Sequence, residues 1–197
     1  ATEESATCIA RRGDDPSLVL VAGRQIVTGE GLEILALAAP GPFADGLPIE
    51  AGIAAVRAAG GIVVLPWGFG KWWGRRGRTI EHCLAGAEPG TLFLGDNGGR
   101  LAAAPPPRQF AIAERQGLMI LPGSDPLPLA AEHDAVARYG FVLDAPEEAL
   151  PHRPAAWLKE RLATLAEQPR SFGRRQAVMP FMARQLAMQW RKRQLGR

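Results

Sequence analysis

The stretch GGIVVLPWGFG, residues 60–70, decides the class of fold. Its two leading glycines end a predicted helix, and the purely apolar run at 62–65 is typical of a strand buried on both faces. A glycine-containing loop follows the run directly. Similar apolar runs that end in polar loops recur at residues 91–99 and 118–125, with predicted helices between them. This order indicates parallel strands joined by right-handed crossovers, hence an α/β layer or barrel.

The residues before this stretch predict an antiparallel pair of strands. Apolar runs at 18–28 and 32–38 are separated only by a Gly-Glu-Gly turn, which is too short for a parallel crossover. A helix is predicted over 48–59, because apolar residues recur there at helical spacing. Residues 2–12 are also predicted to be helical.

Prolines at positions 146, 151 and 154 mark a change of pattern. We therefore divide the chain into an α/β domain at 1–145 and a C-terminal helical extension at 146–197, packed on that domain or linked to it. Helices are predicted at 155–166 and 174–194. The second helix carries an apolar stripe formed by Met179, Met182, Leu186 and Trp190. This stripe could be covered by the acidic part of the chain at residues 1–167, by a second copy of the chain or by a partner protein.

The formal net charge is +3, but the charged residues are unevenly distributed along the chain. Residues 168–197 hold eight basic residues and no acidic one, against 15 basic and 20 acidic residues in 1–167. Only two cysteines are present, and they form no CxxC pair, so a reducing, cytoplasmic location is expected. No apolar run approaches the roughly 18 residues needed to cross a bilayer, and the N-terminus lacks the order of a signal peptide.

Ligands in α/β folds bind at the carboxyl ends of the strands, so polar residues there are candidates. We expect a pocket that binds an anion at the carboxyl ends of the strands. The candidate ligand-binding residues are Arg24, Gln25, Trp67, Lys71, Arg75, Asp96, Asn97 and Asp125.

The loop at 66–78 is the most unusual segment of the chain. It combines three tryptophans, four glycines and four cations. Such a loop could bind an anion that carries a flat ring, as in a nucleotide or single-stranded nucleic acid. Alternatively, its aromatic rings pack on the core and its cations are solvated.

The order of these motifs resembles the polymerase-and-histidinol-phosphatase (PHP) family of metal-dependent phosphoesterases. GRQI at 23–26 resembles the family's Gly-x-Glu-Ile strand end, residues 60–70 its Ala-His-Pro strand end and glycine loop, and GSDPL at 123–127 its Gly-Ser-Asp-x-His motif. The resemblance implies a distorted seven-stranded β/α barrel. It also implies an N-terminally incomplete member with a partial barrel, because the family's opening strands have no counterpart here.

The resemblance also implies a degenerate metal centre. The family's ligands correspond to Gln25, Trp67 and Leu127, which do not suit a hydrolytic metal ion, and Asp125 is the only retained ligand. Such a cluster needs several nitrogen or carboxylate ligands to hold the ion and its activated water. We therefore expect neither a metal ion nor another cofactor.

Three functions follow, and the sequence leaves open whether the protein is an enzyme. The first is a PHP-like domain that binds a phosphate-like or other anionic small molecule without metal-dependent hydrolysis. The second is a hydrolase, a metal-dependent phosphoesterase, with Asp96 and Asp125 as catalytic candidates and Zn, Mn, Fe or Mg as cofactor. Each of these carboxylates could instead cap a turn. The third is nucleic-acid or protein binding, or homo-oligomer formation, through the basic C-terminal helix.

Overall fold

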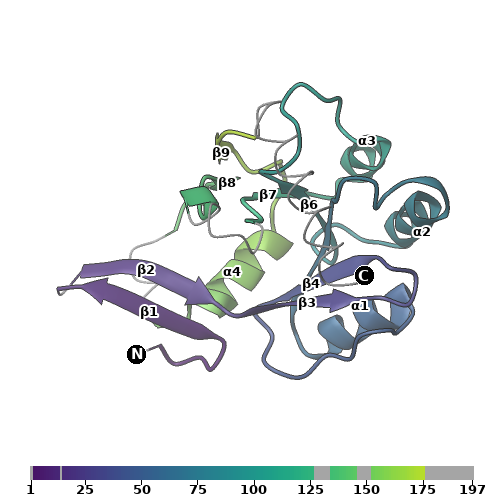
Figure 1. The fold of residues 1–197 in the computed structure, drawn as a ribbon. Helices are drawn as coiled ribbons and strands as arrows, with labels where there is room; N and C mark the ends of the chain where they lie inside the picture. The colour runs from purple at the N-terminus through teal and green to yellow at the C-terminus, as the bar shows by residue number, and fades with distance from the viewer. Residues whose placement is uncertain (1, 14, 127–133, 146–151, 176–197) are drawn as a thin grey trace, which may run out of the picture.

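An open five-stranded sheet forms the centre of the molecule (Figure 1). The computed structural model describes residues 2–13, 15–126, 134–145 and 152–175. The first two strand pairs of the sheet are antiparallel and the last two are parallel. In spatial order the strands are β3 (Gly23–Val27), β4 (Glu33–Leu37), β5 (Ile62–Pro66), β6 (Phe93–Asn97) and β7 (Ile120–Gly123).

Helices cover both faces of this sheet. One apolar cluster joins Val63 and Leu65 of β5 to three helices, α1 (Ile49–Ala58), α2 (Gly74–Ala85) and α3 (Arg108–Arg115). A second cluster joins Ile62 and Val64 to α4 (Pro154–Ala163) on the opposite face. Alternate residues of β5 thus face opposite layers, which explains why this strand is apolar throughout. The α/β class predicted from the sequence is confirmed.

The predicted seven-stranded barrel is wrong. Among the described residues the sheet stays open, with β3 at one edge and β7 at the other. In the part of the chain that the structure describes, two of the connections in the sheet run between parallel strands, because β4 pairs antiparallel with both β3 and β5. The outer edge of β7 is instead covered by Gln168, whose side chain accepts from Ile120 N–H at 2.9 Å and donates to Leu118 C=O at 3.2 Å.

Two small antiparallel ribbons flank the main sheet. The first pairs β1 (Thr7–Arg12) with β2 (Asp15–Val21), and the second pairs β8 (Tyr139–Phe141) with β9 (Ser171–Gly173). The helix predicted at 2–12 is therefore wrong, because β1 takes its backbone partners from β2, and the Gly-Asp pair that separates the two runs in the sequence was a hairpin signal that sequence reasoning missed. The predicted antiparallel pair of β3 and β4 is confirmed. The helix predicted at 174–194, with its apolar stripe, lies almost entirely outside the described residues.

Two distant parts of the chain meet at the first turn of α4. The Glu4 carboxylate accepts hydrogen bonds from the backbone N–H groups of Ala155 and Ala156, both at 2.8 Å. Amides in the first turn of a helix have no intrahelical acceptor, and negative charge is favoured there by the helix dipole. Glu4 therefore supplies the cap that the side chain at the N-cap position, Arg153, does not.

Within the described ranges, no helix has the length and apolar character required to cross a membrane.

Candidate functional site

The parallel strands β5, β6 and β7 end at the same edge of the sheet, and one amide connects the three ends. Asn97 Nδ2 donates to the carbonyl oxygen of Trp67 at 2.9 Å and to Asp125 Oδ2 at 3.0 Å. Asn97 Oδ1 is buried and has no hydrogen-bond partner within the described part of the chain. The topology thus brings together Trp67, Asn97 and Asp125 of the predicted set.

Asp96 takes part in a separate, buried ion pair. Arg100 binds both of its carboxylate oxygens, through Nε at 2.7 Å and Nη2 at 3.0 Å, and both side chains are buried. Tyr139 donates its hydroxyl to the same carboxylate at 3.0 Å, and Arg175 lies 4.0 Å away. A buried carboxylate is stable only when it is paired and hydrogen-bonded in this way. Both oxygens of Asp96 are therefore already occupied by protein groups.

The same network affects the acidity of Tyr139. Burial, followed by the negative charge of Asp96 and the hydrogen bond to it, raises the pKa of Tyr139 to about 12. The phenol therefore remains a protonated donor to Asp96 at neutral pH.

Lys71 and Gln25 meet at a carboxylate that sequence reasoning missed. Glu33, the first residue of β4, forms an ion pair with Lys71 Nζ and accepts a hydrogen bond from Gln25 Nε2 at 2.9 Å. The antiparallel register of β3, β4 and β5 places Glu33 near the carboxyl end of β5. The short turn between β3 and β4 predicts the pairing of these two strands only, and the pairing of β4 with β5, which brings Lys71 to Glu33, has no signal in the sequence. The charge of Lys71 is neutralised by this contact.

The structure places Arg24 and Arg75 apart from these clusters. Arg24 Nη2 lies 3.8 Å from Asp45 Oδ2, and both side chains are about half exposed. Arg75 is exposed in the first turn of α2. In the described part of the chain, no group of three or more His, Cys, Asp or Glu side chains is placed to hold a metal ion.

A pocket of about 530 Å³, here called the tryptophan–arginine pocket, lies between α2 and the start of α3. Trp73 is 66 % exposed at this pocket, and its ring meets Phe69 edge-on at 5.4 Å between centroids. Glu81 accepts from Arg108 Nη2 at 3.0 Å and from Gln109 Nε2 at 2.8 Å. The lining residues are Trp67, Trp72, Trp73, Gly74, Gly77, Arg78, Glu81, Pro107, Arg108 and Gln109.

Sequence reasoning identified only half of this pocket. Trp67, Trp72, Trp73 and Arg78 belong to the unusual loop at 66–78, although residues from Gly74 onward begin α2 instead of continuing the loop. The wall from α3 was missed, because the packing of α3 beside α2 brings it there and no local motif marks it. The pocket thus combines aromatic rings, two arginines and one carboxylate.

Comparisons with known proteins give little information about the function of this site. No protein-family model and no curated protein matches the chain. The crystal structure of PsfC from Pseudomonas syringae PB-5123 is similar, with 14 % sequence identity and a TM-score of 0.49. The match covers 88 % of this chain and 65 % of the PsfC chain, so the chain spans less than two thirds of that protein's length.

Proposed function

We propose that this chain binds a small anionic molecule carrying a flat aromatic ring, of the nucleotide class, in the tryptophan–arginine pocket, and does not hydrolyse it. The observation that carries this proposal is the presence of two partly exposed tryptophan rings, Trp67 and Trp73, in one pocket with Arg78 and Arg108. The volume of about 530 Å³ is in the usual range for small-molecule sites.

The tryptophans supply stacking surface for the ring. An exposed indole leaves a large apolar surface in contact with water, so covering it with a ligand is favourable. Stacking of a base on an aromatic side chain contributes roughly 1–3 kcal/mol. The edge-on contact with Phe69 limits the motion of Trp73, which favours binding because less freedom is lost.

The arginines supply the charge for the anion. Arg78 forms no ion pair with any described residue. Arg108 forms an ion pair with Glu81 through Nη2, and its side chain is mostly exposed. Guanidinium groups bind phosphate and carboxylate oxygens through two parallel hydrogen bonds. Glu81 orients Arg108 and Gln109 and would itself repel an anion, so we expect the anionic group near Arg78.

The pairing of charges at the strand ends favours binding over hydrolysis. Arg100 holds both oxygens of Asp96, and Glu33 neutralises Lys71. The alternative of a phosphoesterase that uses Asp96 and Asp125 stays a prediction, and so does the resemblance to the PHP family.

A cytoplasmic location also stays a prediction. It agrees with Cys8 and Cys83 being free thiols, the second with its pKa raised by burial to about 11.

Isothermal titration calorimetry with AMP, adenosine and inorganic phosphate tests the proposal. We expect AMP to bind more tightly than either part alone. Trp73→Ala and Arg78→Gln should each weaken AMP binding by about 10- to 100-fold, since each removes roughly 1–3 kcal/mol. Arg115→Gln, at the end of α3 and outside the pocket, is the matched control and should bind normally.

Two results would contradict the proposal. Either AMP fails to bind at millimolar concentration, or it binds equally well to the wild type and to both pocket variants. Release of phosphate from AMP on addition of Mn²⁺, lost in Asp125→Asn, would instead support the phosphoesterase alternative.

A further inference from the structure

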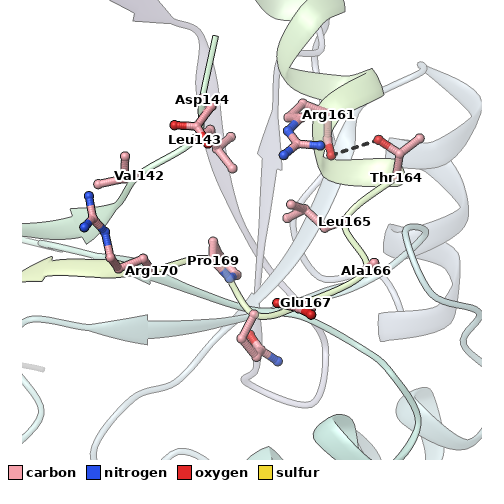
Figure 2. A pocket seen from close by; sticks show the side chains of 11 residues that line it. Val142, Leu143, Asp144, Arg161, Thr164, Leu165, Ala166, Glu167, Pro169 and Arg170 are labelled. Atoms are coloured by element: carbon pink, nitrogen blue, oxygen red, sulfur yellow. Dashed lines mark hydrogen bonds between the residues drawn. The ribbon is translucent and has the colours of Figure 1, made fainter.

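A second pocket, of about 620 Å³, lies between the C-terminal end of α4 and the segment that follows β8 (Figure 2). It shares no residue with the tryptophan–arginine pocket. Four charged side chains line it, and none of them forms an ion pair with another residue of the described ranges: Asp144, Arg161, Glu167 and Arg170.

We propose that this pocket binds a small aliphatic amino acid as its zwitterion. In this arrangement the ligand carboxylate binds Arg161, its ammonium group binds Asp144 or Glu167, and its hydrocarbon side chain lies on the apolar wall of the pocket.

Arg161 is the residue that would bind the anionic group. Its Nε is buried and has no hydrogen-bond acceptor among the described residues. Because the Nε atom itself is closed to any molecule in the pocket, an anion would bind the terminal Nη groups of this guanidinium, whose charge no described residue balances in an ion pair. Figure 2 shows the guanidinium on the α4 side of the pocket, facing the segment that carries Leu143. Its planar fork matches the two oxygens of a carboxylate.

The acidic residues determine which anion fits. Asp144 and Glu167 are exposed and lie in the same pocket, so they disfavour a dianion such as phosphate by like-charge repulsion. Conversely, they favour a ligand that carries a positive group beside its carboxylate. An amino acid has both charges at the short separation that one pocket requires.

The apolar wall accounts for the aliphatic part of the ligand. Leu143 and Leu165 pack partly against the second apolar cluster, and Val142 is 38 % exposed beside them. Burying a leucine side chain on such a surface contributes about 1.5–3 kcal/mol when burial is complete. A branched aliphatic amino acid therefore uses the wall better than a small polar one.

The pocket is held in place from both sides before any ligand binds. Gln168 is hydrogen-bonded to the edge of β7, and Val142 N–H donates to Arg170 C=O at 2.9 Å. Thr164 Oγ1 donates to the carbonyl oxygen of Arg161 at 3.3 Å, the dashed line in Figure 2. A site that is already ordered loses less entropy on binding.

Calorimetric titration of the intact chain with four probes tests this proposal. The probes are L-leucine, 4-methylpentanoate, which lacks the ammonium group, 3-methylbutylamine, which lacks the carboxylate, and inorganic phosphate. We expect L-leucine to bind at least about 10-fold more tightly than either single-charge analogue, because each analogue loses one charge-assisted contact of roughly 1.5–3 kcal/mol. Phosphate binding as tight as leucine binding, or no leucine binding at millimolar concentration, would overturn the proposal.

Two variants separate the contributions of the charges. Arg161→Gln should weaken leucine and 4-methylpentanoate binding by about 10- to 100-fold, whereas the matched control Lys159→Gln, on the same helix but outside the pocket, should not. The double variant Asp144→Asn/Glu167→Gln should weaken leucine binding and leave 4-methylpentanoate binding unchanged or stronger. This second variant decides the question even if Arg161→Gln does not fold. Unchanged leucine binding in the double variant contradicts the zwitterion.

Discussion

At the scale of single residues, partners decide what a polar side chain does. Asp96 and Asn97 are neighbours at the end of β6, yet Asp96 is enclosed by Arg100 and Tyr139, whereas Asn97 connects Trp67 to Asp125. Neighbouring strand residues point to opposite faces, so adjacency in sequence does not place them in one site.

Replacing Asp96 should destabilise the fold strongly. Asp96→Asn leaves the buried Arg100 without its counter-charge, so we expect a loss of about 3–5 kcal/mol in the free energy of unfolding. Urea denaturation measures this change. Arg24→Gln removes an exposed pair and should cost less than about 1 kcal/mol. Similar losses in the two variants would show that the buried pair is not stabilising.

Tyr139 is the only tyrosine in the sequence, so its ionisation can be followed directly at 295 nm. The native pKa is raised to about 12 from an ordinary value near 10, so the folded state holds the proton more tightly. This contribution to stability is fully present below pH 10 and is lost as the pH rises toward 12. We expect a native titration midpoint near 12 and an unfolded midpoint near 10. In Asp96→Asn the native midpoint should fall, and an unchanged midpoint would remove Asp96 as a cause.

The sequence predicted where candidate residues lie better than what they contact. The apolar runs before Trp67, Asn97 and Asp125 located three strand ends, and the structure brings those ends together. Glu33 was missed, because a single acidic residue at a strand start has no local signal. Its contact with Lys71 depends on the register of three strands.

At the scale of elements, helix ends depend on residues outside the helix. Of the four helices within the described residues, none has a side-chain hydrogen bond from its own N-cap residue. In α1, the Ile49 N–H donates to Glu30 at 3.2 Å, and in α4 the acceptor is Glu4. Sequence patterns therefore located α1 and α4 but not the groups that cap them.

Removing the Glu4 cap should weaken α4. Glu4→Ala leaves two first-turn amides without their acceptor, and loss of a helix cap costs about 0.5–2 kcal/mol. Thermal unfolding followed by circular dichroism measures the effect. Glu3→Ala removes only an exposed pair with His152 and is the matched control. Equal melting temperatures for the two variants would argue against the capping role.

At the scale of the whole molecule, the α/β class of the fold was predictable from the sequence. Whether the sheet stays open or closes into a barrel was not. Runs such as residues 62–65 require cover on both faces, which correctly predicts helical layers around a sheet. Whether the sheet closes depends on which strands become its edges. Here β7 is covered by a glutamine, and β8 pairs with β9 instead of extending the main sheet.

Both layers should contribute comparably to stability. Leu84 of α2 and Leu162 of α4 are each buried, on opposite faces of the sheet. We expect Leu84→Ala and Leu162→Ala each to cost about 2–5 kcal/mol, whereas Leu47→Ala, at a more exposed position, should cost much less. Chemical denaturation of the three variants checks this. A small effect of Leu162→Ala alone would mean that α4 is not an integral layer.

The contact between Glu4 and α4 also has a consequence for the timing of biosynthesis. Its two sides are 151 residues apart in the chain. At the usual translation speed of about 5–20 residues per second, roughly 8–30 s pass between the emergence of Glu4 and that of the backbone amides of α4 that donate to it. Glu4 therefore remains without its partner while the residues up to Ala155 are synthesised, and strands of the sheet that form in the meantime lack their cover from α4.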